Sequence, residues 1–220
     1  QLLCLSLVLM RCQPLRRALE LGIVMKDLHH LLNELCACFE SKGHLVASSL
    51  LAPLTEKELE AKCASWFPGE IPTAIKDLYT WKGGQGHNAW EEEFPFLFRD
   101  MSFISLDQAE AEYESMNQSY GFENTLEEDG VLIKDCFPFA AFNGGWFVIP
   151  ASKNKWSNSF DEPVICIFQG IDLYYHSIDK MVKTVIECIQ YPTWSTEESY
   201  IPADIEMKIW KKHNPGIFEE

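Results

Sequence analysis

The chain has 220 residues, of which 47% are hydrophobic and 13% aromatic, with 18 lysines and arginines against 33 aspartates and glutamates. This length suits one domain with its own core, and the aromatic content excludes a disordered acidic chain. The formal net charge of -15 opposes binding to phosphate backbones and anionic headgroups, so we expect no nucleic-acid and no membrane partner. Any charged partner of this chain is expected to be basic.

The sequence of the first 24 residues does not indicate that they belong to the folded domain. Their apolar run, Leu2–Met10, is shorter than the ~20 residues that a membrane-spanning helix needs. Arg11, Arg16 and Arg17 follow this run, whereas the positive charge of a signal peptide precedes it. We therefore expect residues 1–24 to be either an upstream extension or a leftover of translation-frame choice, and we base no function on them.

The eight cysteines show no repeated spacing and no CxxC motif, which argues against a disulfide framework. Most have apolar neighbours, so we expect free thiols in the core of a cytoplasmic protein. Potential metal ligands cluster at His29, His30, Cys36, Cys38 and His44. Because Cys36 and Cys38 would point to different faces of a helix, we predict no structural metal, and nothing in the sequence predicts a cofactor.

Helical patterns dominate the first third of the chain. An amphipathic pattern predicts a helix over 25–42 that Gly43 terminates. Thr55 and Glu58 have the spacing of a capping box at the start of a second helix, which ends before Pro68. A third short helix is predicted within 70–81, with Pro72 in its first turn.

From residue 94 onward the pattern changes to short apolar and aromatic runs between turns. Strands are predicted at 94–98, 103–105, 131–134, 136–141, 146–150, 164–168 and 172–176, with a helix at 105–117 after the second of them. Turns at Asn143-Gly144-Gly145 and Gln169-Gly170 favour an antiparallel meander. A strongly amphipathic helix over 177–191 follows, and 193–220 is predicted to wrap the surface with a short helix near 202–212.

Helices followed by strands and a further helix predict an α+β fold. We expect a single domain over 25–192 in which the helices at 25–42, 56–81 and 177–191 cover one face of an antiparallel sheet, with 193–220 packing on it as an extension.

No catalytic motif stands out, so we predict that the chain is not an enzyme. His176, beside Asp172 and Asp179, could act as a general base, but a surface salt bridge is the favoured interpretation. The run Glu91-Glu92-Glu93 could bind a cation. Adjacent side chains on extended backbone point to alternate faces, which favours an acidic edge facing solvent or a partner.

Four motifs occur in a recognisable succession. Gly69-Glu70-Ile71-Pro72 precedes Leu78-Tyr79-Thr80-Trp81 and Gly83-Gly84; Phe103–Ala109 comes next, and Phe137–Ala140 lies just before Asn143-Gly144-Gly145. This order over roughly residues 50–190 resembles the SUKH superfamily, the Smi/Knr-type domains. The structural positions of that resemblance are Pro72, Tyr79, Trp81, Gly83, Gly84, Gly144 and Gly145. Lys82 and Trp146 depart from its usual pattern, so no ligand role is transferred to them.

The resemblance implies a domain that binds proteins and catalyses no reaction. Many bacterial members of the superfamily look like immunity proteins that neutralise a toxin domain, while eukaryotic relatives resemble regulatory or adaptor modules. The acidic composition fits the first role, because many such toxins have basic clefts and complementary charge speeds association. The adaptor role is the alternative, and an uncharacterised enzyme is a third possibility.

Aromatic anchors combined with carboxylates in turns mark the predicted partner-binding surface. One stretch contains Trp90, Glu91, Glu92 and Glu93, and the other contains Trp156, Asp161 and Glu162. Trp81 and Trp146 are instead expected in the core, since large aromatic side chains are mostly buried.

Overall fold

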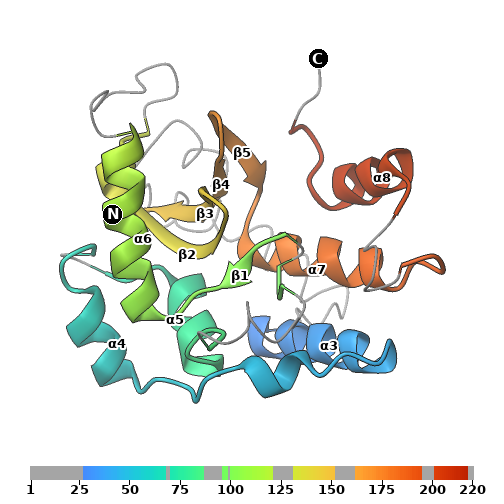
Figure 1. The fold of residues 1–220 in the computed structure, drawn as a ribbon, viewed down its shortest axis with the longest axis horizontal. Coiled ribbons are helices and arrows are strands. Elements are labelled where there is room, and N and C mark those ends of the chain that lie inside the picture. Colours follow the sequence, from blue (N-terminus) through green and yellow to red (C-terminus); the bar gives the residue numbers. More distant parts are fainter. Residues whose placement is uncertain are drawn as a thin grey trace, which may run out of the picture.

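The computed structural model of the chain describes residues 27–67, 70–86, 96–98, 100–120, 131–151, 162–194 and 201–217 (Figure 1). The helices are α3 (Leu28–Ser41), α4 (Glu56–Cys63), α5 (Thr73–Trp81), α6 (Leu106–Tyr120), α7 (Ile178–Ile189) and α8 (Ala203–His213). The strands are β1 (Ser102–Phe103), β2 (Cys136–Phe142), β3 (Gly145–Pro150), β4 (Val164–Ile167) and β5 (Ile171–Tyr175). The predicted α+β class is confirmed: these elements form one domain.

The strands form one antiparallel sheet in the order β1-β2-β3-β4-β5, as the predicted meander requires. The β2–β3 hairpin closes through Asn143 and Gly144, which have φ values of 50° and 76°. Positive φ at both central residues suits the right-handed twist of the strands, and Asn-Gly is the sequence that adopts it most readily. The sheet therefore pairs strands that follow one another in the sequence: β2–β3 and β4–β5 are tight hairpins, whereas α6 lies between β1 and β2 in the chain.

The strands predicted at the start of the sheet need correction. Residues 94 and 95 lie outside the described residues, and Phe98 forms an isolated bridge with Met101 instead of a strand. The strand predicted at 103–105 lies one residue earlier, as β1. The strand predicted at 131–134 is wrong, because 133–135 form a 3-10 turn before β2. Val131 and Ile133 are buried in alternation with more exposed residues, as they would be in a strand. The segment with the 3-10 turn buries the same two side chains, so the sequence pattern did not distinguish the two structures.

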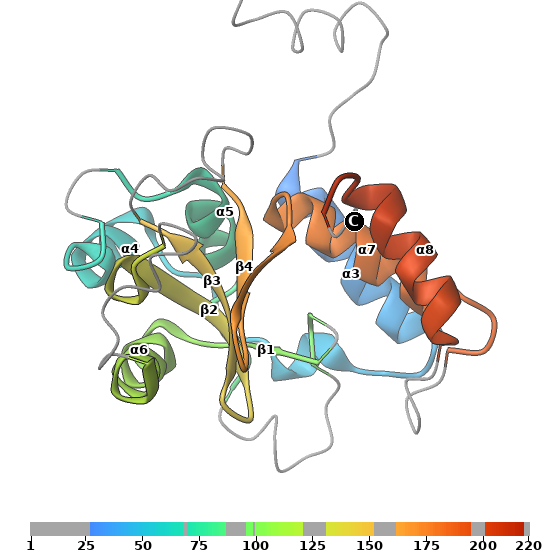
Figure 2. The same cartoon turned by 90° about the horizontal axis from the view of Figure 1, so that it is seen from above.

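Helices lie on both faces of the sheet, which corrects the expectation of one covered face (Figure 2). Successive strand residues point to opposite faces. On one face, the indole N–H of Trp146 donates to Glu112 Oε2 of α6 at 2.6 Å. On the other, the ring of Phe147 lies 5.7 Å from that of Tyr175, which in turn contacts Trp210 of α8. Because nearly all of β3 is buried, both of its faces need cover.

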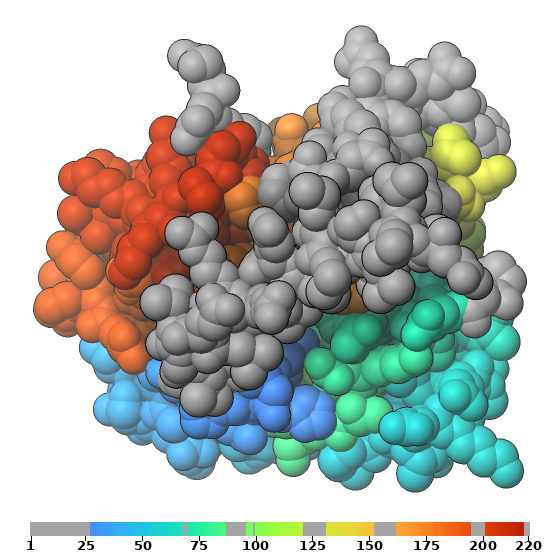
Figure 3. Space-filling view, turned by 180° about the vertical axis from the view of Figure 1, so that it is seen from behind, coloured from blue at the N-terminus to red at the C-terminus, as the bar shows by residue number. Residues whose placement is uncertain are grey.

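The helices separate into two groups around the sheet. Figure 2 shows α4, α5 and α6 on one side and α3, α7 and α8 on the other. Seen from behind in Figure 3, the surface of α3 (blue) lies below those of α7 (orange) and α8 (red), while α4 and α5 (cyan to green) lie at the opposite side. The main apolar core runs between the groups and includes Trp210 and Ile217 of the C-terminal segment, while Cys188, Ile201 and Ile209 form a second, smaller cluster.

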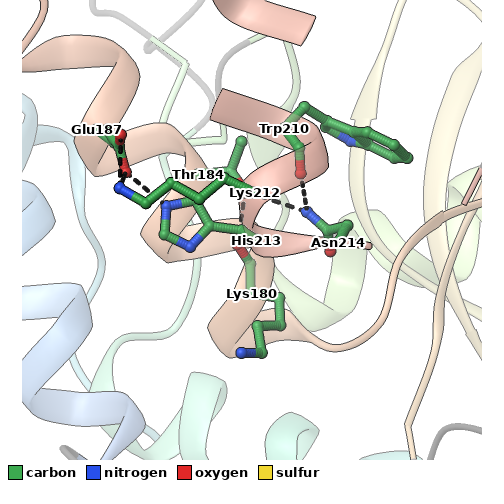
Figure 4. Close-up of polar contacts among 7 residues, drawn as sticks. All are labelled: Lys180, Thr184, Glu187, Trp210, Lys212, His213 and Asn214. Atoms are coloured by element: carbon green, nitrogen blue, oxygen red, sulfur yellow. Dashed lines mark hydrogen bonds and ion pairs between the residues drawn. The ribbon is translucent and has the colours of Figure 1, made fainter. Parts of the chain in front are cut away.

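Helix α8 is fixed to α7 by polar contacts (Figure 4). The fully buried Asn214 accepts a hydrogen bond from the backbone N–H of His176 and donates to Thr184 Oγ1 and to the carbonyl of Trp210. Glu187 contacts Lys212 Nζ and His213 Nε2, each at 2.7 Å. The predicted C-terminal helix is thus confirmed and is part of the domain.

Candidate partner-binding surface

The turn after α5 depends on two glycines. Gly84 has a φ of 109°, and a Cβ at this position would lie 2.5 Å from the backbone nitrogen of Ser105. A Cβ on Gly83 would lie 2.6 Å from the carbonyl oxygen of Ala52. Both distances are shorter than any van der Waals contact, so each glycine allows a close approach of two backbones. These positions therefore join the turn to the segment before α4 and to the start of α6.

Gln85 follows this turn and is almost fully buried. Its Oε1 accepts hydrogen bonds from the backbone N–H groups of Leu97 and Phe103, each at 3.1 Å, and its Nε2 donates to Ser49 Oγ. A buried amide that satisfies several groups holds its surroundings in one arrangement. Through these hydrogen bonds, Gln85 holds the segment that ends at Gly86 next to the segment that begins at Phe96.

No sequence motif marks Gln85 as important. A polar side chain between Gly84 and Gly86 resembles an ordinary turn residue, and its hydrogen-bond partners are 12 to 36 positions away in the chain. The predicted residues Trp90, Glu91, Glu92 and Glu93 come between the segments that Gln85 joins, and they lie outside the described residues. Their role in partner binding stays a prediction.

Glu162 is the described member of the second predicted stretch, and it contacts α5. Its Oε1 accepts from the backbone N–H of Thr73 at 2.6 Å and its Oε2 from that of Ala74 at 2.8 Å. A carboxylate at a helix N-terminus satisfies free N–H groups and complements the helix dipole. Glu162 therefore has a role inside the domain, while Trp156 and Asp161 lie outside the described residues.

A cavity of about 250 Å³ lies beside Glu162. Its lining comes from the approach to α5, the end of β3 and the residues before β4, and includes Ile71, Pro72, Pro150 and Pro163. Glu70 also lines it and approaches Lys76 within 3.7 Å. The pocket thus has apolar side chains in its lining but presents more polar than apolar surface, and its two carboxylates both contact groups of α5.

The aromatic positions of the motif are core residues, as predicted for Trp81 and Trp146. Trp81 donates from its indole nitrogen to Asn33 Oδ1 at 2.9 Å. Tyr79 is fully buried and donates to the carbonyl of Ile104, and its burial raises its pKa well above the ordinary value. These contacts join α5 to α3 and to the sheet, so the motif serves the fold.

Cys36, Cys63, Cys136 and Cys166 are protonated thiols at neutral pH. Burial raises the pKa of Cys36, Cys63 and Cys166 to about 11 and that of Cys136 to about 12. Thiolates are the nucleophilic and metal-binding form, so these residues are inert at neutral pH. None of the described cysteines forms a disulfide, which agrees with their predicted role as small core side chains.

The histidine considered as a general base lies at the junction of β5 and α7. Burial, followed by the charge of Lys180, lowers the pKa of His176. Asp179 contacts Ser177 and Lys183; burial raises its pKa, but these contacts outweigh burial and leave the pKa lowered. Asp179 is therefore engaged within its own helix.

Within the described ranges, no group of three His, Cys, Asp or Glu side chains could hold a metal ion. No helix in these ranges is long and apolar enough to cross a membrane.

Carboxylates gather on the outer surface of α4 and α6, which we call the acidic face. Its exposed carboxylates are Glu56, Glu58, Glu60, Asp107, Glu110 and Glu114, and α4 also exposes Lys57 and Lys62. The two helices meet through the ion pair of Lys62 with Asp107 and the edge contact of Trp66 with Tyr113. Helix α6 has no lysine or arginine, so its charged side chains are all negative.

Comparisons with known proteins provide no family assignment: a scan against protein-family models finds no match, and a search of curated proteins finds no significant one. The resemblance to the SUKH superfamily therefore stays a prediction from the four sequence motifs.

Proposed function

We propose that the chain is a non-catalytic module that binds and inhibits a basic protein, in the manner of an immunity protein acting on a toxin domain. The observation that supports this proposal best is the acidic face. Helix α6 presents carboxylates along its exposed side, and the whole chain has a formal charge of -15. Such a surface attracts a cationic protein over a Debye length of ~8–10 Å and suppresses wrong partners.

The charge pattern of α6 is not needed for its fold. Its buried residues Leu106, Ala109 and Met116 fix its packing on the sheet, whereas Glu110 and Glu114 face solvent. Like charges at i and i+4 on one helix destabilise it by ~0.2–0.5 kcal/mol. A surface that retains this unfavourable spacing is consistent with selection for binding.

The test begins with the full chain, purified from cells that produce it, and identification of the protein that co-purifies. We expect a basic protein whose association with the chain slows as salt increases. In the variant Glu110→Gln/Glu114→Gln, association at low salt should slow by ~3–10-fold and its salt dependence should flatten, with little change in dissociation.

The control variant Glu40→Gln/Asp204→Asn removes the same charge from exposed positions of α3 and α8, on the other side of the sheet. It should change association much less. A neutral or acidic partner, or association that does not respond to salt, would contradict the inhibitor role and favour the adaptor role.

The same kinetic measurements test the predicted aromatic anchors. Trp90→Ala or Trp156→Ala should increase the rate at which the partner dissociates.

A further inference from the structure

Two exposed phenylalanines lie at the same end of the sheet. Phe142 ends β2 with 37% of its surface exposed, and Phe168 follows β4 with 51% exposed. The hairpin turns β2–β3 and β4–β5 that these residues adjoin lie together in Figure 2. Scattered exposed apolar side chains are ordinary, but a contiguous group marks an interaction site.

The two rings belong to one continuous patch. A Cβ on Gly145 would lie 3.2 Å from Phe168 Cδ2, 3.1 Å from Met101 Cε and 3.4 Å from the carbonyl oxygen of Phe142. Phe96 extends the patch, with its ring centroid 4.5 Å from that of Phe142. We call Phe96, Phe142 and Phe168, together with the buried Met101, the tip patch. The absence of a side chain at Gly145 leaves room for the ring of Phe168, which a Cβ at this position would crowd.

The backbone beneath the patch is held in a costly conformation. Gln169 has a φ of 56°, a left-handed backbone conformation that is unfavourable for residues other than glycine. Its N–H donates to the hydroxyl of Tyr120, at the end of α6, at 3.2 Å. Strained backbone that a neighbouring element fixes is typical of functional sites. Here it keeps the turn that presents Phe168 in place, next to the last turn of the acidic α6.

Charge indicates the kind of partner. Asp100 and Asp172 are exposed beside the patch, and the described segments that form it, 96–98, 100–103, 142–146 and 167–172, contain no lysine or arginine. Arg99 lies outside the described residues. A second copy of this chain would have the same net charge of -15, and like charges across an interface repel each other. A basic partner avoids this repulsion.

We infer that the tip patch is the apolar centre of the partner-binding surface, and that it accepts a protein segment with an apolar side chain flanked by lysines or arginines. This inference rests on the proposed function and adds a location and a chemistry to it. Aromatic side chains at the centre of an interface contribute most of the binding energy, while charges at the rim mainly set the association rate.

The probe is a phage-displayed library of random peptides, selected on the full wild-type chain. Selected peptides should combine an aromatic or aliphatic residue with lysines and arginines. Their affinity should fall about tenfold or more for Phe168→Ser and for Phe142→Ser. It should fall less than about twofold for Leu45→Ser, a control that removes a side chain 67% exposed near α3. Unchanged thermal midpoints establish that all variants fold.

Each other result overturns the inference in a distinguishable way. Basic peptides that bind Phe168→Ser and Phe142→Ser as well as wild type would refute the tip patch and leave the proposed function standing. Peptides that need the patch but lack basic residues would refute the partner chemistry and weaken the proposed function. Self-association of the wild-type chain that Phe168→Ser abolishes would identify a second copy as the occupant. A library that yields no binder would also count against the patch.

Discussion

Gly84 and Gly144 share a left-handed backbone but differ in their surroundings. Their φ values are 109° and 76°. No atom lies within 4 Å of a Cβ built on Gly144, whereas a Cβ on Gly84 would lie 2.5 Å and 2.7 Å from the backbone N and Cα of Ser105. The pair therefore separates the cost of backbone conformation from the cost of a steric overlap.

We expect Gly144→Ala to lower the free energy of unfolding by about 1–2 kcal/mol, the cost of the left-handed conformation. Gly84→Ala should lower it by about 2–5 kcal/mol, because the β1–α6 junction must also move. Urea denaturation of both variants and of wild type provides the comparison. Equal losses would show that the approach to Ser105 can relax freely and would contradict the packing described for this turn.

At the scale of elements, the attachment of α8 depends on Glu187 of α7. Partial burial raises the pKa of Glu187, but hydrogen bonds from Lys212 and His213 outweigh burial and leave the pKa below its ordinary value of 4.5. A carboxyl group with a lowered pKa in the folded state stabilises that state above its ordinary pKa. This contribution is lost as pH falls through the lowered pKa.

Glu187→Gln should therefore destabilise the chain by about 1 kcal/mol at neutral pH. The difference from wild type should shrink as pH falls below 4.5, where the wild-type carboxylate becomes protonated. Thermal unfolding between neutral and acidic pH measures it. Asp204→Asn is the control, since its ion pair with Lys208 is exposed and should contribute little. A difference between wild type and Glu187→Gln that stays constant with pH would contradict this role.

For the whole molecule, charge opposes folding. With 33 acidic and 18 basic residues, repulsion among unpaired carboxylates outweighs the ion pairs at the surface, such as Lys62 with Asp107. Salt screens both the repulsion and the ion pairs, so the larger of the two decides whether added salt raises or lowers the stability.

We expect the thermal midpoint to rise when salt increases from ~0.01 to ~0.1 M, a range in which the Debye length falls from ~30 to ~10 Å. Scanning calorimetry at fixed neutral pH measures the shift. An equal osmolarity of sucrose is a control, because its effect does not depend on charge. A midpoint that falls with salt would mean that surface ion pairs contribute more than the net repulsion.

Features that depend on neighbouring residues could be predicted from the sequence. The periodic apolar stripes of α3 and α7, the capping box of Thr55 and Glu58, and the Asn143-Gly144 hairpin turn each place their signal within a few residues of the structure that they specify. The α+β class follows from the order of these elements. The net negative charge follows directly from the composition, whereas the exposed carboxylates of α4 and α6 were not predicted as a site.

The tertiary structure alone decided what depends on residues far apart in the chain. Helices lie on both faces of the sheet because β3 is apolar on both, a fact that the alternation rule for half-exposed strands does not anticipate. Glu162 contacts α5 from 88 and 89 positions away, and Gln85 reaches both Ser49 and Phe103. Phe142 and Phe168 become neighbours through the pairing of β3 with β4. Such contacts form when the chain folds as a whole, so no local pattern records them.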